Sequence, residues 1–406
     1  MRTRLKAAKE STMTDNHEND KTYIYVGTIG AKGHGKTTLT AAITYVLAKE
    51  HLSAPQSFAS IDDAPEYTTN TGVTCRSSMV DYASKSYVYF HSDCPDYMDY
   101  AKGLITGHLR MGTAILVVSI DVGFNRETDE YLRLLRSMGI SNVIVYINKA
   151  DLIHDEEFIS EMASLITEQL EEAGYDRALS PVIVGSAEKA LEGDPKWENS
   201  IKALVQAMED YVVPPVPLKD QPFVMPVEDI FMVSWRDTLA RSRITSGTLY
   251  KNDELELVGI RDTQHTRCSS IEVERRLKDS AQATELAAVG LKGIDREDIE
   301  EGMVLGKNGS IKPYTRFEAL LYCLTGDEGG RKTPLYNGFE GDFRLHYLDV
   351  AGTASWPRDI EMMVPGDELN VTVRLSKSMA MKAGVKFEVR QHGQVVAVGR
   401  VTCPIG

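Results

Sequence analysis

A glycine-rich segment, residues 30–37, has the residue types and the spacing that hold phosphate groups. It reads Gly-Ala-Lys-Gly-His-Gly-Lys-Thr and fits the pattern G-x-x-x-x-G-K-[ST]. Glycines let backbone N–H groups surround phosphate oxygens, the lysine adds positive charge, and the threonine hydroxyl can bind Mg²⁺. A strand pattern precedes the segment and a helix pattern follows, so the amino end of that helix also favours an anion. We expect a nucleotide site made by Gly30, Lys32, Gly33, His34, Gly35, Lys36, Thr37 and Thr38.

A second polar segment, residues 148–151, follows another apolar strand pattern and reads Asn-Lys-Ala-Asp. Ligands bind at the carboxyl ends of parallel strands. A carboxylate there can accept two hydrogen bonds from the edge of guanine, which adenine cannot offer. The pattern is common by chance, but behind a phosphate loop at this distance it predicts a guanine site. We expect the base to be held by Asn148, Lys149, Asp151, Ser186 and Ala187.

Oxygen-bearing residues also lie where a magnesium ion beside the phosphates would bind. Asp93 follows the strand pattern 87–92, and an aspartate after this strand holds Mg²⁺ through water in phosphate-loop proteins. Thr74, in a Thr-Gly-Val-Thr segment, is a further candidate. Together with Thr37 they form the expected metal site. The alternatives are a solvated turn aspartate and an ordinary loop threonine.

Apolar strands alternate with amphipathic helices in the first half of the chain. This alternation predicts a parallel sheet covered by helices on both faces. The strand patterns fall at residues 22–30, 87–92, 114–120 and 142–148, and the helix patterns at 36–49, 128–138 and 157–172.

Five prolines between residues 212 and 227 mark an extended linker. Beyond it the strand patterns are short and alternating, with glycine-containing turns, which predicts two small β-barrels. We expect a disordered tail at 1–21, a nucleotide-binding domain at 22–212, the linker at 213–226, and barrels at 227–311 and 312–406.

Composition is typical of a soluble globular protein, with 42% hydrophobic and 26% charged residues among 406. No apolar run reaches about 18 residues, so we expect no membrane span, and the polar first residues do not resemble a secretory signal. Met1 and Met13 are alternative starts. The formal net charge of −14 argues against a general nucleic-acid coat but allows a local basic patch for one folded RNA. Five cysteines without metal-ligand spacing predict reduced thiols in a cytosol.

Over nearly its whole length the chain resembles bacterial elongation factor Tu, of the translational GTPase family. The resemblance implies a GTPase domain and two β-barrels that bind GTP or GDP with Mg²⁺. It also implies a cytoplasmic monomer that carries aminoacyl-tRNA to the ribosome and is served by a nucleotide exchange factor. The segments that carry it are 27–30, 34–44, 61–66, 114–118, 190–194, 227–231, 327–331 and 364–367.

The chain departs from the family in residues 93–97, the second switch. The family reads Asp-Cys-Pro-Gly-His there, and this chain reads Asp-Cys-Pro-Asp-Tyr. The family's glycine N–H meets the γ-phosphate and its histidine positions the attacking water, so Tyr97 is a doubtful catalytic residue. Asp96 adds a negative charge, which at about 4 Å and an effective dielectric constant of about 20 costs about 4 kcal/mol, unless it turns outward. We expect impaired or unusual hydrolysis; neutral drift in a working enzyme is the alternative.

Two other segments near the phosphates also depart from the family. Gly33 stands where the family has an aspartate that helps bind a monovalent cation, and Lys32 could supply positive charge instead. The first switch, residues 67–71, is one residue longer than the family's and lacks its lysine and arginine. Contacts with the ribosome or tRNA are therefore expected to differ.

The resemblance also implies a site for the 3′ end of aminoacyl-tRNA in the second domain. Phe231 would stack on the terminal base, worth ~1–3 kcal/mol, or else fill the core. Leu286 and the segments 235–237 and 241–243 depart from the family, which predicts a restricted or different cargo. In the third domain a basic pair would meet tRNA phosphates, or is merely solvated. The tRNA residues expected on this basis are Glu228, Asp229, Phe231, Glu272, Arg331 and Lys332.

These patterns predict an elongation factor Tu-like carrier of aminoacyl-tRNA with slow or unusually triggered GTP hydrolysis. The alternative is a pseudo-GTPase paralogue that binds nucleotide and a tRNA or protein partner outside normal elongation. A GTPase of the sulfate-activation kind shares the domain plan, but the end of this chain is closer to the tRNA carriers.

Overall fold

The first domain is built on a six-stranded sheet. The computed structural model describes residues 22–212, 214–234, 237–273 and 275–406, so the predicted tail at 1–21 lies outside the described residues. Every neighbouring pair of strands is parallel except β4 and β5, which are antiparallel. The strand order is β4 (Ser78–Ala83), β5 (Tyr87–Asp93), β1 (Thr22–Ile29), β6 (Thr113–Ser119), β7 (Asn142–Asn148) and β8 (Val182–Val184).

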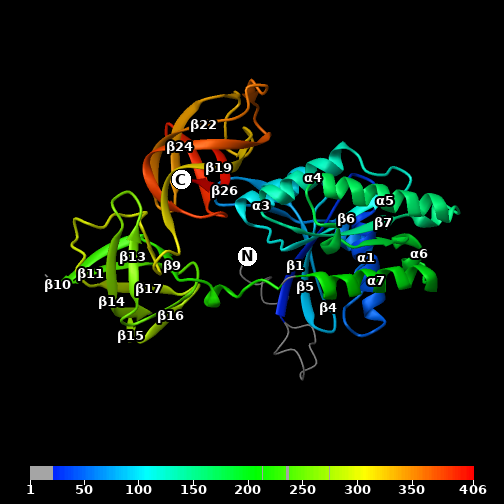
Figure 1. Ribbon diagram of the computed structural model, residues 1–406, viewed down its shortest axis with the longest axis horizontal. Coiled ribbons are helices and arrows are strands. Elements are labelled where there is room, and N and C mark those ends of the chain that lie inside the picture. Colours follow the sequence, from blue (N-terminus) through cyan, green and yellow to red (C-terminus); the bar gives the residue numbers. More distant parts are fainter. Residues whose placement is uncertain (1–21, 213, 235–236, 274) are drawn as a thin grey trace.

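Helices cover both faces of this sheet (Figure 1). Successive residues of β6 point to opposite faces, so Leu116 packs in one apolar cluster and Ile115 in another. Because both faces are buried, β6 is apolar almost throughout. The first cluster includes α3 (Tyr97–Thr106), α4 (Arg126–Ser137) and α5 (Glu156–Glu172); the second includes α1 (Lys36–Ala48), α6 (Ala187–Leu191) and α7 (Pro195–Tyr211).

A local side chain decides where helix α4 begins. Helix α4 begins before the predicted residue 128, because the Asn125 side chain accepts a hydrogen bond from the Thr128 N–H and caps the helix. Between α1 and β4 lie a short helix, α2 (Phe58–Asp62), and an antiparallel hairpin of β2 (Glu66–Thr68) and β3 (Thr74–Arg76).

The second domain is an antiparallel sheet around one apolar core. Its strand order is β10 (Asp229–Ser234), β11 (Asp237–Arg243), β17 (Leu286–Leu291), β14 (Gln264–Val273), β13 (Glu254–Val258), β18 (Val304–Gly306) and β9 (Val224–Pro226). Strand β15 (Arg276–Lys278) pairs with β14, and β12 (Thr248–Tyr250) pairs with β16 (Ser280–Gln282).

The third domain is a closed barrel. Its strands are β19 (Lys312–Cys323), β24 (Glu368–Met381), β22 (Leu348–Ser355), β21 (Phe339–Leu345), β25 (Lys386–Gln391) and β26 (Gln394–Ile405), in that order. A two-stranded ribbon of β20 (Leu335–Tyr336) and β23 (Met362–Met363) accompanies it. The predicted fold class, an α/β phosphate-loop domain followed by two all-β domains, is confirmed.

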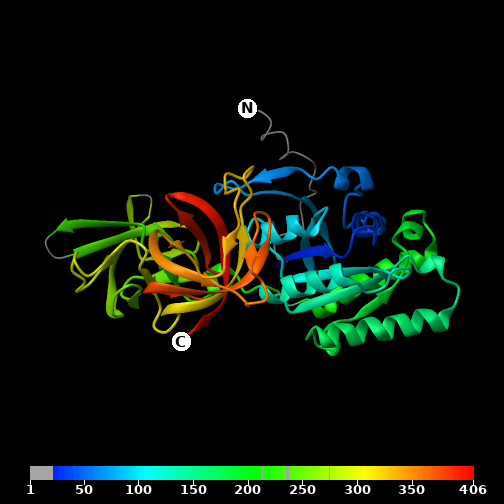
Figure 2. The same cartoon turned by 90° about the horizontal axis from the view of Figure 1, so that it is seen from above.

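The third domain lies between the other two (Figure 2). Its outer residues Tyr322 and Val398 belong to the same apolar cluster as Tyr100 and Leu104 of α3. A small cluster that includes Val224 and Ala380 joins it to the second domain. No helix among the described residues is long and apolar enough to cross a membrane.

Candidate functional site

The phosphate loop lies between the end of β1 and the start of α1, and it packs closely on two neighbouring strands. Gly30 and Gly35 have φ values of 142° and 90°, in the region that favours glycine. A Cβ on Gly30 would lie 2.2 Å from the carbonyl oxygen of Val117, and one on Gly35 would lie 2.3 Å from Asn148 Nδ2. The close approach therefore requires glycine at both places, whereas a Cβ on Gly33 would have no described atom within 4 Å.

Lys36 is buried inside this loop. Its ammonium group donates to the carbonyl oxygen of Gly30 at 2.8 Å. Burial lowers the pKa of Lys36, while the carboxylates of Asp93, Glu127 and Asp96 oppose that shift. A cation held at the base of a glycine loop can neutralise charge on a bound phosphate.

Asp93 and two threonines form a tight group beside the loop. Thr28 Oγ1 donates to Asp93 Oδ1 at 2.6 Å, and Thr37 Oγ1 donates to Oδ2 at 2.7 Å. Burial raises the pKa of Asp93, and these two hydrogen bonds oppose the rise. The structure thus brings together two of the three predicted magnesium residues, and a hydroxyl beside a carboxylate is an oxygen donor set that suits Mg²⁺.

Thr74, the third predicted magnesium residue, is not part of this group. It lies in β3, where its hydroxyl pairs with that of Thr68 at 3.0 Å. Its backbone N–H donates to Glu328 of the third domain at 3.5 Å. Among the described residues no hydrogen bond joins Thr74 to Thr37 or Asp93, so this role stays a prediction.

Asn148 fastens the three loops expected to hold the nucleotide. Its Nδ2 donates to the carbonyl oxygen of His34 at 2.9 Å, and its Oδ1 accepts from the Ala187 N–H at 2.9 Å. Lys149 has a positive φ of 61°, which turns the chain towards the half-buried Asp151. Ser186 caps α6 through its side chain.

Two other residues predicted to contact the phosphates, His34 and Thr38, have other roles or surroundings in the structure. His34 is buried with Nδ1 facing the Val117 carbonyl at 3.2 Å, and burial lowers its pKa, which disfavours the charged form. Thr38 is half-buried in the first turn of α1.

Glu127, at the start of α4, was missed by the sequence analysis. Its two carboxylate oxygens each lie 3.2 Å from the Lys32 backbone nitrogen, which donates to them. A carboxylate therefore occupies an N–H group of the phosphate loop. No short motif surrounds Glu127, and only the tertiary packing of α4 against the loop brings it there.

Asp96 and Tyr97, the two departures in the second switch, both turn to local or distant partners. Asp96 is exposed, and its side chain caps α3 by accepting from the Asp99 N–H at 3.0 Å. The Tyr97 hydroxyl donates to the carboxylate of Glu368 in the third domain. Its ring meets that of Tyr131 edge-on, with centroids 5.2 Å apart.

The residues expected to meet tRNA lie on an outer face of the second domain. The strand register aligns Asp229 with Arg241, Arg241 with Ala288, and Ala288 with Glu272. Phe231 follows two residues after Asp229 on the same strand and is 44% exposed, so it is not core filler.

Leu286, Arg243 and Glu228 lie on or beside the strands of this face. Leu286 is 40% exposed and pairs with Arg243, whose guanidinium donates to the Thr284 carbonyl at 2.5 Å. Glu228 is exposed beside β10. Trp235 and Arg236, which depart from the family, lie outside the described residues.

The two basic residues of the third domain, Arg331 and Lys332, have different surroundings. Arg331 bonds to Thr333 and to Gln391, and its guanidinium lies 5.9 Å from the Phe339 ring centre. Lys332 is exposed. Only Lys332 therefore presents its charge freely to a phosphate.

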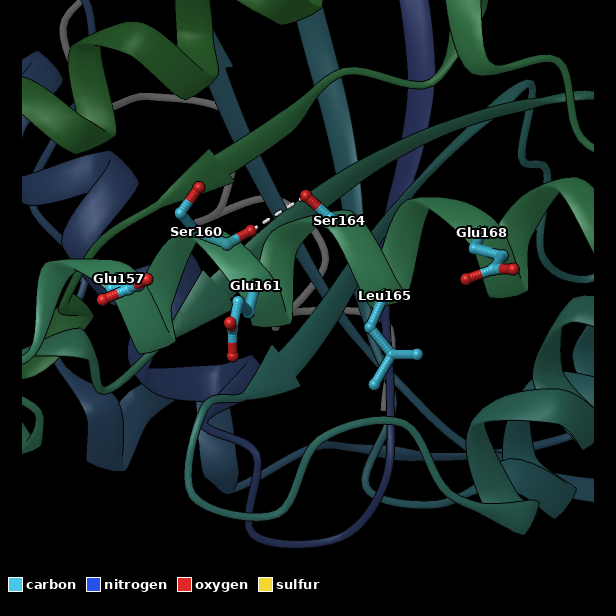
Figure 3. A pocket seen from close by; sticks show the side chains of 6 residues that line it. All are labelled: Glu157, Ser160, Glu161, Ser164, Leu165 and Glu168. Atoms are coloured by element: carbon cyan, nitrogen blue, oxygen red, sulfur yellow. Dashed lines mark hydrogen bonds between the residues drawn. The ribbon is translucent and has the colours of Figure 1, made fainter.

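A surface hollow along α5 contains none of the predicted residues (Figure 3). Its lining comes from a single helix and consists of Glu157, Ser160, Glu161, Ser164, Leu165 and Glu168. Three glutamates repel phosphates, so this hollow is no alternative nucleotide site.

Three family models match the chain in domain order. Residues 21–214 match the elongation factor Tu GTP binding domain, residues 237–306 match elongation factor Tu domain 2, and residues 310–403 match the elongation factor Tu C-terminal domain. The first model covers the phosphate loop, Asp93 and Asn148, so the match includes the guanine nucleotide site. The chain belongs to the elongation factor Tu-like translational GTPases.

Proposed function

We propose that this chain binds GTP and GDP with Mg²⁺ and carries aminoacyl-tRNA, in elongation or in a specialised variant of it. The observation that carries the proposal is the joining of the phosphate loop to the base loops by Asn148, beside the Thr37–Asp93 pair. Lys36 neutralises the phosphates, Thr37 and Asp93 hold the metal ion, and Asp151 recognises guanine.

GTP hydrolysis is proposed to be slow or to need an unusual trigger. The support is the engagement of Tyr97 with Glu368, which directs its hydroxyl to another domain. The capping role of Asp96 also removes much of the expected charge repulsion, because the carboxylate faces its own helix. The Tyr97–Glu368 contact also favours a second candidate, a pseudo-GTPase that binds nucleotide without hydrolysing it, and the outward-facing Asp96 is compatible with that binding.

The tRNA proposal rests on the outer face of the second domain. Exposed Phe231 offers a stacking platform, and Glu272 offers acceptors for an amino group. Leu286 makes this face more apolar, which favours a restricted cargo. A monomer in the cytoplasm, with the ribosome and an exchange factor as partners, completes the proposal.

Nucleotide choice tests the first part. Displacement of a fluorescent GDP by GTP, GDP, ATP and XTP should show guanine preference, and Asp151→Asn should shift that preference towards xanthine. Asp155→Asn is the matched control, because Asp155 only caps α5 and asparagine also caps helices. Equal displacement by ATP and GTP would refute the guanine site.

Protection of an aminoacyl ester tests the second part. With GTP bound, the protein should slow ester hydrolysis of aminoacyl-tRNA, and Phe231→Ala should weaken that protection by about tenfold. Met232→Ala, at the neighbouring exposed position, is the control. Single-turnover GTP hydrolysis on programmed ribosomes separates the two candidate functions. Rapid, ribosome-stimulated hydrolysis by the wild type would refute the pseudo-GTPase.

A further inference from the structure

The third domain contacts helix α3 at its beginning, middle and end. Tyr97, the first residue of α3, bonds to Glu368 of β24. Lys102 in the middle forms an ion pair with Glu328 at 2.8 Å. At the end, the Arg400 guanidinium of β26 donates to the Leu104 carbonyl at 3.0 Å. The helix that follows the second switch is thus held by another domain along its whole length.

The contact at the beginning of α3 is partly buried. Glu368 Oε2 is shielded from solvent and has no hydrogen-bond partner among the described residues, while the other oxygen accepts from Tyr97. The Tyr97 ring is enclosed by Tyr131 of α4. Breaking this hydrogen bond would leave two partly buried polar groups without this partner, which costs more than losing a hydrogen bond in open solvent.

The contact in the middle joins helix α3 and strand β3 to one carboxylate. Glu328 Oε1 faces Lys102 of α3 and also the backbone N–H of Thr74 in β3. The other oxygen accepts from the Tyr322 hydroxyl at 2.7 Å and from Thr325. Four residues therefore hold Glu328, which in turn connects β3 and α3.

The contacts at the two ends match the dipole of the helix. A carboxylate, Glu368, lies at the amino end, and cations lie at the carboxyl end. Lys386 joins Arg400 there, since a Cβ on Gly107 at the helix end would lie 2.3 Å from its ammonium nitrogen. The partial negative charge at the carboxyl end of the helix attracts both cations.

The segment before α3 is consequently tethered on both sides. Asp93 is fixed by Thr28 and Thr37, and Tyr97 is fixed by Glu368. Only residues 94–96 lie between these anchors, so the chain beside the phosphates has little freedom to move.

We infer that the third domain clamps α3 through Tyr97 and Glu368, and that this clamp restrains nucleotide hydrolysis until it is released. Tyr97 is then an interdomain anchor and does not touch the reacting atoms. The inference rests on the proposed function, guanine nucleotide turnover. It distinguishes this chain from one in which the residue at position 97 orients the attacking water.

Two variants break the clamp from opposite sides. Tyr97→Phe removes the hydroxyl but keeps the ring, and Glu368→Ala removes its acceptor from the other domain. Tyr131→Phe is the matched control. It removes a buried hydroxyl from the ring that packs on Tyr97, and this hydroxyl has no hydrogen-bond partner among the described residues. Each protein is loaded with GTP and Mg²⁺, and single-turnover hydrolysis and amide hydrogen exchange of residues 97–106 are measured.

The clamp predicts that Tyr97→Phe and Glu368→Ala each speed hydrolysis and amide exchange by about tenfold. The double variant should be no faster than either one, since both remove the same bond. Slower hydrolysis in Tyr97→Phe would overturn the inference, because it would make the hydroxyl catalytic; unchanged rates and exchange would overturn it too. If the wild type fails to bind GTP, the proposed function fails, and amide exchange without nucleotide alone decides whether the clamp exists.

Discussion

Replacing Glu368 by glutamine should change how the stability of the protein depends on pH. Burial raises the pKa of Glu368 from 4.5 to about 6, the hydrogen bond from Tyr97 opposes the rise, and nearby Glu130 adds to it. Glutamine keeps an oxygen that accepts from Tyr97 but carries no charge. The comparison therefore isolates the cost of burying the carboxylate.

The magnitude follows from the two pKa values. Because the carboxyl group has the higher pKa in the folded protein, folding favours the protonated form. The resulting stability is fully present below pH 4.5 and is lost as the pH rises through about 6. In total it amounts to about 2 kcal/mol, of which about 1 kcal/mol is lost between about pH 5 and about pH 7.5.

Urea unfolding of the GDP-loaded proteins, followed by fluorescence at those two pH values, measures this difference. We expect the free energy of unfolding of Glu368→Gln relative to wild type to increase by about 1 kcal/mol on going to the higher pH. Groups common to both proteins cancel. A relative free energy that is constant with pH, or that moves in favour of the wild type, would refute the burial of a charged carboxylate at this contact.

Three further changes test the nucleotide site. Gly35→Ala should abolish binding of fluorescent GDP, because its Cβ would lie 2.3 Å from Asn148 Nδ2. Gly33→Ala has a similarly unfavourable φ of 82°, against 90° at Gly35, but no described atom within 4 Å of its Cβ, so it should lose clearly less affinity; similar losses would contradict the packing. Thr37→Ala should remove the dependence of GDP dissociation on Mg²⁺, seen as a rate that a chelator no longer increases; a chelator effect of wild-type size would exclude Thr37 as a ligand. Asn148→Ala should speed GDP dissociation by about tenfold or more, since it leaves the Ala187 N–H unpaired, and an unchanged rate would show that the loops hold without it.

Much of the nucleotide site follows from contiguous sequence. Phosphate groups bind to backbone N–H groups of a single loop, so residues 30–37 specify their own function wherever a strand and a helix flank them. Asn148 and Asp93 could be predicted because parallel strands end at one edge of the sheet. Glu127 could not, since α4 carries no motif and reaches Lys32 only through the packing of the helix on the sheet.

For the second switch, the sequence predicts less and the tertiary structure decides more. The sequence shows that Asp96 and Tyr97 replace a glycine and a histidine of the related family, and it predicts that hydrolysis is altered. It could not show what Tyr97 does instead, because its partner Glu368 lies 271 residues further along the chain, in another domain.

The position of the β2–β3 hairpin was also decided by a contact with a distant part of the chain. Thr74 is a plausible metal residue by its local sequence, but Glu328, 254 residues away, holds its backbone in a hairpin. By itself, the sequence determined that this chain binds a guanine nucleotide, because that chemistry is local. Only the folded arrangement of three domains decided which groups hold its switches, because docking surfaces depend on side chains that no short pattern connects.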